Sequence, residues 1–251
     1  MTNKSLIKAV GIAAGLSFVP ASFATVVDIE TTQGTIQVNL FDQSTPKTVA
    51  NFLTYVNEQS YVDTVIHRSV EDFVVQGGGF TFDGETLQPI DVNGTVDNEP
   101  EWSNIEGTIA MAKVAGDPDS ATSQWFFNVG NNSANLDLQN EGFTVFGQVV
   151  SGMNVVEQIN QLETCGDVPM VDFSDSDCTS NVTPTDANLV KIISITVSDS
   201  STDTEDSVDK VPNIFEPITP TPDPGGDDSS SGGSMPLMLI GLLGLMRLFR
   251  K

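Results

Sequence analysis

Two short segments in the first fifth of the chain alternate apolar and polar residues. In residues 27–31, and again in residues 36–40, every second side chain is apolar or Thr. This alternation gives each segment one apolar face, which is typical of half-buried β-strands. Gln33-Gly34 lies between them as a turn. The pattern therefore predicts a β-hairpin.

Two other segments carry helical spacing. Thr45-Pro46 offers a hydroxyl cap with proline at the first helical position, and apolar residues then recur at i, i+3, i+4 and i+7: Val49, Phe52, Leu53 and Val56. A similar apolar face recurs within residues 152–162. We expect amphipathic helices over Pro46 to Gln59 and over Gly152 to Leu162.

The remaining apolar runs are short and bounded by Gly, Asn and Asp: VIHRSV, FVVQG, TIAMA, QWFFNV, FTVFGQVV and VKIISITV. Many short strands with only two helices predict a β-barrel or sandwich with helices covering its ends. The span from Thr25 to Ser198, about 170 residues, is long enough for one domain with its own core.

The first 24 residues have the layout of a secretory signal peptide. Lys4 and Lys8 precede an apolar run from Ala9 to Val19, and small residues follow up to Ala24. The run is too short to cross about 30 Å of hydrocarbon, which disfavours a permanent anchor. We expect cleavage after Ala24 and export to the periplasm, the cell surface or the medium.

The C-terminal end combines an acidic, Pro- and Ser-rich segment, residues 200–234, with an apolar tail, residues 235–251. The first cannot bury a core and is predicted to be a disordered linker. In the tail, Met235 to Met246 spans 12 residues, fewer than the roughly 20 of a spanning helix. Lying behind Gly232-Gly233, the tail resembles the GlyGly-CTERM sorting signal. The resemblance implies removal by the intramembrane protease rhombosortase, so both termini would contact the membrane only transiently; a weak permanent anchor is the alternative.

Charge narrows the range of partners. Removing both ends would leave 5 of the 10 Lys and Arg residues against all 34 Asp and Glu residues, a net charge of −29. Such a chain repels phosphates and anionic lipid headgroups, which excludes nucleic acid as a partner.

Cys165 and Cys178 are the only cysteines of the chain. We expect them to form a disulfide, because an exported chain usually meets an oxidising compartment. Two cysteines and one histidine offer too few soft ligands for a zinc site, and no metal is expected. The acidic run from Asp172 to Asp177 lacks EF-hand spacing and is interpreted as a solvated loop rather than a calcium site.

The segment VIHRSVEDFVVQGGGF, residues 65–80, contains the sole histidine, His67, beside Arg68 and ahead of three glycines. No Lys-Ser/Thr follows the glycines, which excludes a phosphate-binding loop, and no G-x-S-x-G motif supports a serine hydrolase. The glycines are most simply a tight bend at which side chains would clash.

This segment and two later ones, EGTIAMAKVAGDPDSATSQWFFNV and NLDLQNEGFTVFGQVVSGMNVVEQI, together resemble the cyclophilin family of peptidyl-prolyl cis-trans isomerases, of the bacterial periplasmic type. The resemblance runs in order from Val27 to about Val197, within a domain placed at residues 25–199. It implies a mainly β fold, a closed eight-stranded antiparallel β-barrel capped by two helices. It also implies a monomer that acts without a cofactor on proline-containing unfolded or exported polypeptides.

The resemblance further assigns site residues. It places the catalytic arginine on Arg68 and its neighbouring histidine on His67. The implied apolar pocket consists of Phe73, Val74, Phe126, Leu136 and Phe143. Gln76 and Gln124 match polar groove residues, and Ala112 and Lys113 match the segment whose backbone grips the peptide. We expect His67 to be a hydrogen-bonded structural neighbour, because isomerisation transfers no proton, and Phe127 to face the core.

Several positions depart from the family pattern. Asn135 stands where Trp or Phe is common, which predicts weak cyclosporin binding. Val74 replaces a usual Met, Phe143 a usual His or Tyr, and Glu71-Asp72 a common Pro-Gly. The departures leave an alternative open: a catalytically weak cyclophilin-like binding module or holding chaperone at the cell surface. Retention of Arg68 and of the apolar pocket favours the enzyme.

Overall fold

The computed structural model describes residues 25–200 and 204–214 of the chain. The predicted signal peptide, the linker beyond residue 214 and the apolar tail lie outside the described residues. Within the described part, no helix is long and apolar enough to cross a membrane.

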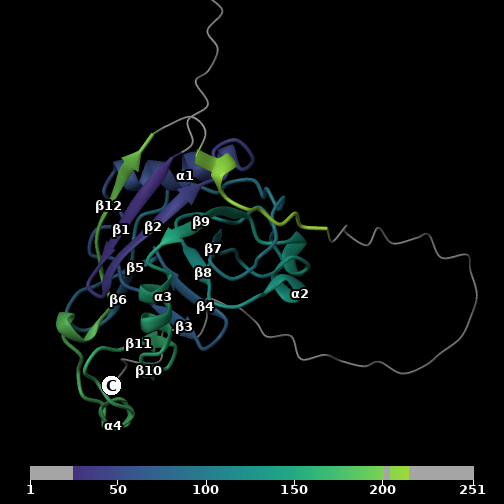
Figure 1. Cartoon of the computed structure of the whole chain (residues 1–251). Coiled ribbons are helices and arrows are strands. Elements are labelled where there is room, and N and C mark those ends of the chain that lie inside the picture. Colours follow the sequence, from purple (N-terminus) through teal and green to yellow (C-terminus); the bar gives the residue numbers. More distant parts are fainter. Residues whose placement is uncertain (1–24, 201–203, 215–251) are drawn as a thin grey trace, which may run out of the picture.

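An antiparallel sheet of eight strands curls around the core (Figure 1). In spatial order the strands are β12 (Ile192–Asp199), β1 (Val26–Thr31), β2 (Gly34–Leu40), β9 (Val145–Ser151), β7 (Thr108–Met111), β8 (Trp125–Asn128), β4 (Val74–Gly77) and β3 (Arg68–Val70). The predicted hairpin is confirmed as β1 and β2, whose alternate residues point into the core.

The sheet is open, so the expectation of a closed barrel is wrong. Its edge strands are β12 and β3, and no ladder joins them. Between these two edges, Val65, just before β3, forms a single β-bridge with Lys191. Hydrogen bonds from Ile66 N to Val190 O (2.9 Å) and from Ile192 N to Thr64 O (2.8 Å) flank this bridge. The contact is too short to count as a strand pairing.

Both predicted helices are present, as α1 (Pro46–Asn57) and α3 (Met153–Asn160). Their apolar faces pack on the main core cluster inside the sheet. The expected hydroxyl cap of α1 is absent: Thr45 Oγ1 donates to Phe41 O (3.1 Å). Glu99, distant in sequence, accepts instead from the backbone N–H of Thr48 (2.9 Å), which satisfies one donor of the first turn.

Shorter elements lie between the strands of the main sheet and after its last strand. They are β5 (Phe80–Phe82), β6 (Leu87–Pro89), α2 (Ser133–Leu136), η1 (Gln139–Glu141), β10 (Thr164–Cys165), β11 (Val168–Pro169), α4 (Asp175–Thr179), η2 (Asp186–Asn188) and η3 (Thr204–Ser207). The pattern of short apolar runs did not separate them from loops. Helices of one turn bury too few residues to leave a periodic signal.

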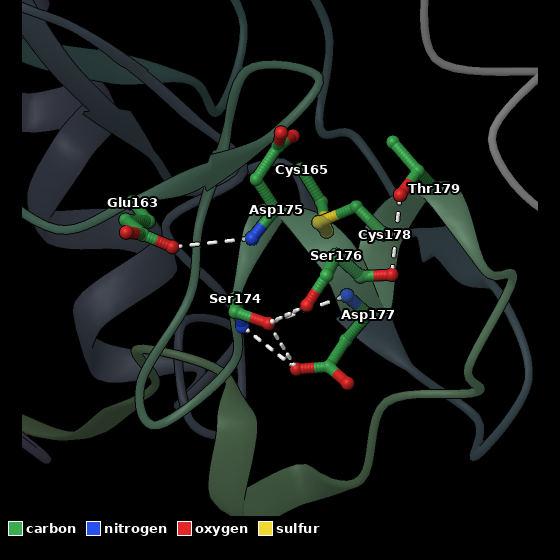
Figure 2. The surroundings of a disulfide bond; sticks show 8 residues. All are labelled: Glu163, Cys165, Ser174, Asp175, Ser176, Asp177, Cys178 and Thr179. Atoms are coloured by element: carbon green, nitrogen blue, oxygen red, sulfur yellow. Dashed lines mark hydrogen bonds between the residues drawn. A yellow bond between two sulfur atoms is a disulfide. The ribbon is translucent and has the colours of Figure 1, made fainter.

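The predicted disulfide is confirmed between Cys165 and Cys178 (Figure 2). Only the second half of the acidic run that we interpreted as a loop lies in α4, which is capped by Ser174, whose Oγ accepts from Asp177 N (3.3 Å). Asp177 in turn accepts from the backbone N–H of Ser174 (2.9 Å), so these two residues form a reciprocal capping box. In the described ranges, no group of three or more acidic, His or Cys residues could hold a metal ion.

Residues 204–214 fall within the segment expected to be a disordered linker, yet they pack on the domain. Glu205 is 1% exposed, and Pro212 forms a β-bridge with Trp102. The composition of this segment predicts disorder, but a few specific contacts hold it. Figure 1 shows it in yellow-green, passing from beside α1 toward α2.

Candidate active site

Strand register sets one side of the site. Arg68 on β3 lies directly opposite Gln76 on β4, and Gln76 lies opposite Phe126 on β8. Phe126 is in turn opposite Ala110 on β7. Directly opposed residues of antiparallel strands project from the same face of a sheet. The three residues Arg68, Gln76 and Phe126 therefore form one row across the sheet.

A shallow pocket, whose empty volume of about 230 Å³ includes open solvent, lies over this row. Its lining is Arg68, Phe73, Val74, Gln76, Ala112, Phe126, Leu136 and Phe143, all of which the sequence had singled out. The rings of Phe126 and Phe143 meet edge to face, with centroids 5.8 Å apart. As predicted, Phe126 belongs to the pocket cluster, while Phe127 packs in the main core.

Four of the five basic residues in the described ranges pair with a carboxylate, and Arg68 has the longest of these contacts. Its Nε lies 3.6 Å from Asp167, whereas Lys47, Lys191 and Lys210 lie within 2.8 Å of a carboxylate oxygen. The Arg68 side chain is 20% exposed, and its Cζ lies 6.0 Å from the centre of the Phe73 ring. Burial lowers the pKa of Arg68, while Asp167 works against the shift. An arginine remains charged nevertheless, because its pKa starts so high.

His67 lies behind Arg68 and does not line the pocket. It is 3% exposed, and burial lowers its pKa to about 4, so the imidazole is neutral at pH 7. Its ring packs edge to face on Phe80 at 4.8 Å. The Nδ1 atom has no hydrogen-bond partner, but a side-chain hydrogen bond with Gln124 opposes the lowering of the pKa, so the expected hydrogen-bonded neighbour is confirmed in part. Packing rather than proton transfer explains this position.

Gln124 and Lys113 flank the pocket without lining it. Gln124 accepts a hydrogen bond from Gln76 Nε2 (2.9 Å), and its backbone carbonyl accepts from Ala112 N (2.9 Å). The Lys113 side chain turns inward and donates to Asn140 O (2.8 Å) and Gly142 O (2.6 Å). Burial lowers the pKa of Lys113 to about 8. Its ammonium also lies 5.0 Å from the centre of the Phe143 ring, so the side chain supports a pocket wall.

A buried polar network behind the pocket was not predicted from the sequence. Asn132 Nδ2 donates to Phe73 O (2.9 Å) and to Asn128 Oδ1 (2.7 Å). Asn104 Nδ2 donates to Phe143 O (3.0 Å) and to the carboxylate of Asp137 (2.9 Å). The network thus holds the backbone of two pocket residues. A cluster of Asn and Asp between apolar runs was the only available signal, and it reads equally well as loop composition.

Two departures from the family pattern have visible consequences. Asp72, where Gly is common, has φ +54°, a left-handed conformation that Asp tolerates better than most residues. Asn135 does not line the pocket, and its side chain accepts from Gln139 Nε2. Weak cyclosporin binding stays a prediction.

The family described as cyclophilin type peptidyl-prolyl cis-trans isomerase/CLD matches residues 26–180. The chain is 40% identical over 171 residues to peptidyl-prolyl cis-trans isomerase A of Dickeya dadantii, covering 65% of this chain and 87% of that protein. It is 39% identical over 147 residues to peptidyl-prolyl cis-trans isomerase B of Escherichia coli, covering 55% and 85%.

Solved structures agree on the fold. A cyclophilin type peptidyl-prolyl cis-trans isomerase of Cryptosporidium parvum aligns with TM-score 0.52 and 21% identity, over 71% of this chain and 99% of that one. The same protein in the presence of the dipeptide Ala-Pro gives TM-score 0.51.

The chain therefore belongs to the cyclophilin family. Its activity is that of a peptidyl-prolyl cis-trans isomerase.

Proposed function

We propose that this isomerase acts on X-Pro bonds of other exported polypeptides, with Arg68 as the catalytic residue and the apolar pocket as the proline site. One observation carries the assignment: a loosely paired guanidinium lies in one strand-to-strand row with the aromatic residue Phe126, at the edge of an apolar pocket.

The chemistry requires only electrostatics and shape. Rotation about a peptide bond climbs roughly 18–20 kcal/mol, because the half-rotated amide loses its resonance. For X-Pro the two planar states differ by about 0.5–1 kcal/mol, so the reaction needs no energy source. A site that binds the twisted amide better than either planar form accelerates exchange in both directions.

Arg68 suits this task. The proline nitrogen becomes pyramidal as the bond twists and gains a lone pair that an N–H can meet. A guanidinium keeps its charge and holds several donors in a fixed plane. Because the contact of Nε with Asp167 is long, at 3.6 Å, it leaves guanidinium donors for the substrate. Phe126, Leu136 and Phe143 would hold the proline ring still while the preceding carbonyl swings.

The two glutamines would hold the peptide backbone. The bond from Gln76 Nε2 to Gln124 Oε1 fixes the orientation of the Gln76 carboxamide in the pocket lining. A fixed amide can exchange hydrogen bonds with the flanking peptide groups at little entropic cost. His67 then has an indirect role, as the buried neighbour of Arg68.

An isomerisation assay on a proline tetrapeptide tests the assignment. We expect Arg68→Ala to lower kcat/KM by about 100-fold or more, equivalent to roughly 2.7 kcal/mol of lost transition-state stabilisation. Lys47→Ala is the matched control, since it removes the same charge at an exposed pair on α1. Full activity in a folded Arg68→Ala protein would refute the mechanism.

The same assay separates the enzyme from a binding module or holding chaperone. A module would bind the tetrapeptide, or keep an unfolded protein soluble, with an exchange rate near that of the uncatalysed reaction. Binding that survives in Arg68→Ala alongside a large loss of kcat assigns the residue to the chemical step.

Export completes the proposal. The N-terminal 24 residues would be removed, and the tail after about Gly232 would be cleaved, releasing a monomer into the periplasm, onto the cell surface or into the medium. The disulfide Cys165–Cys178 supports a location outside the cytoplasm, because structural disulfides persist in oxidising compartments. Mass spectrometry of both termini of protein from the medium and the cell surface tests this directly. Intact Lys251 on most exported molecules would favour the weak anchor instead.

A further inference from the structure

Residues 204–214, here called the C-terminal strap, lie beyond the region that the family match covers. The strap touches the pocket cluster directly, because Val208 packs on the same cluster as Phe126, Leu136 and Phe143. Its contacts form two groups, one at each end.

The first end is fixed by a buried ion pair. Lys210 Nζ lies 2.6 Å from Glu205 Oε1, and the two side chains are 17% and 2% exposed. Glu205 also accepts from Ser44 Oγ (2.5 Å) and from the backbone N–H of Gln43 (2.8 Å). Burial favours the neutral acid, but these hydrogen bonds outweigh it and lower the pKa of Glu205.

Lys210 connects this end to the pocket cluster. Its ammonium lies 5.4 Å from the centre of the Phe41 ring and 5.1 Å from that of Trp102. Both rings belong to the pocket cluster or pack against it. A desolvated cation over two aromatic faces is a favourable contact that an apolar chain of similar length lacks.

The second end grips the backbone beside the pocket wall. Ser103 N donates to Val211 O (2.8 Å), and Asn213 N donates to Glu101 O (2.8 Å). Asn213 Nδ2 donates to the carbonyl of Asp137 (3.3 Å), the residue after Leu136. A Cβ placed on Gly142 would lie 3.1 Å from Asn213 Nδ2, so this side chain also packs against the residue before Phe143.

We infer that the C-terminal strap is a positioning element of the isomerase site, which holds the pocket wall formed by Leu136 and Phe143. Those two residues lie outside the strand row, and a hydrogen bond from Phe143 N to Leu136 O (2.9 Å) connects them. Loosening the strap reduces the fraction of molecules with a formed pocket. Apparent affinity falls in proportion to that fraction. The inference rests on the proposed function, since it takes the pocket as the proline site.

The test compares two ion pairs whose lengths differ by about 0.1 Å in the full chain. Lys210→Met breaks the strap pair, whereas Lys47→Met breaks the exposed pair with Asp97 (2.7 Å). We expect Lys210→Met to raise the KM for a proline tetrapeptide about fivefold while kcat stays within about twofold, at a temperature where the variant is fully folded. Lys210→Arg, which keeps the charge, should restore the KM, and Lys47→Met should leave it unchanged.

Hydrogen exchange supplies a readout that does not depend on activity. In Lys210→Met the amide of Phe143 should exchange about tenfold faster, while that of Phe127 in β8 keeps its rate. Glu205→Gln, which keeps the shape of the side chain, serves as the second variant and should change both quantities in the same direction.

An unchanged KM and unchanged Phe143 exchange in the folded variants would overturn the inference, as would an equal effect of Lys47→Met. Faster Phe143 exchange with an unchanged KM would also overturn it, since the strap would then stabilise a wall that substrate does not sense. Failure of the proposed function is a separate result, namely full activity of Arg68→Ala.

Discussion

The two sides of the pocket are built by different means. On the sheet side, Arg68, Gln76 and Phe126 are fixed by backbone pairing, because each lies opposite the next across neighbouring strands. On the loop side, Leu136 ends a helix of four residues and Phe143 follows η1. The network around Asp137, Lys113 and the C-terminal strap holds that side. One side therefore needs only strand register, and the other needs side chains from distant parts of the chain.

The contacts that support the two sides from behind also differ in kind. Behind the sheet side, the turn between β10 and β11 carries Asp167, whose carbonyl accepts from Ser69 N on β3 (2.7 Å), and the disulfide ties this turn to α4. Behind the loop side, the support is the Glu205–Lys210 ion pair. The covalent support responds to reduction. The ionic one weakens in acid, because a carboxylate with a lowered pKa loses its stabilising contribution as pH falls through that pKa.

The largest effect is expected at Asp137, in the loop-side network. Its carboxylate accepts from Ser103 Oγ (2.6 Å), Asn104 N (2.7 Å) and Asn104 Nδ2 (2.9 Å), and the residue is 4% exposed. Asp137→Ala removes these three buried hydrogen bonds and should lower the free energy of unfolding by about 4 kcal/mol, as measured by urea denaturation. Asp137→Asn keeps part of the acceptor capacity and should lose less. A decrease in the free energy of unfolding below about 1 kcal/mol would show that the network does not stabilise the loop side.

The disulfide is the next largest. Replacing Cys165 and Cys178 by Ser opens a loop with sequence separation 13 and should cost about 3 kcal/mol in the chain-entropy model. The loss should appear in urea denaturation of the double variant, and of the native protein after reduction. Hydrogen exchange of the Ser69 amide should accelerate more than that of the Phe143 amide. Only Ser69 donates to Asp167, in the turn between β10 and β11 beside the disulfide. Equal acceleration at both amides would contradict the division into two sides.

The two sides also differed in how far the sequence could predict them. Short apolar runs placed Arg68, Gln76 and Phe126 on predicted strands, and the family resemblance named all eight lining residues. It could not reveal that Lys113 turns inward, since that depends on the carbonyls of Asn140 and Gly142. Nor could composition show that residues 204–214 pack on the domain, because their packing includes the specific ion pair between Glu205 and Lys210. Periodicity reports faces of regular elements and carries no information on long-range polar pairing. The sheet was likewise expected to close, but closure depends on a few hydrogen bonds at the seam.

His67 gives a smaller effect, visible only in acid. Burial lowers its pKa to about 4 from an ordinary value of 6.5. The folded state therefore binds fewer protons than the unfolded state, and the stability due to the neutral imidazole is complete above pH 6.5 and falls between pH 6.5 and 4. Relative to pH 7, this group should cost about 2 kcal/mol at pH 5. His67→Gln should remove that part of the pH dependence in urea denaturation. An unchanged profile in the variant would mean that the imidazole is solvated when charged.

The smallest effect is expected at Asp167, which pairs with the catalytic candidate Arg68 on the sheet side. The pair with Arg68 is long, at 3.6 Å, and the Asp167 side chain is 59% exposed. Exposed pairs of this kind contribute about 0–1 kcal/mol, so Asp167→Asn should shift the free energy of unfolding by less than about 0.5 kcal/mol. Because the carboxylate competes with substrate for the guanidinium, kcat/KM should rise by up to about twofold at low salt and the gain should vanish at high salt. A loss of about tenfold would instead make Asp167 a positioning residue for Arg68. The turn between β10 and β11, which carries Asp167 beside the disulfide, would then contribute to catalysis as well as to stability.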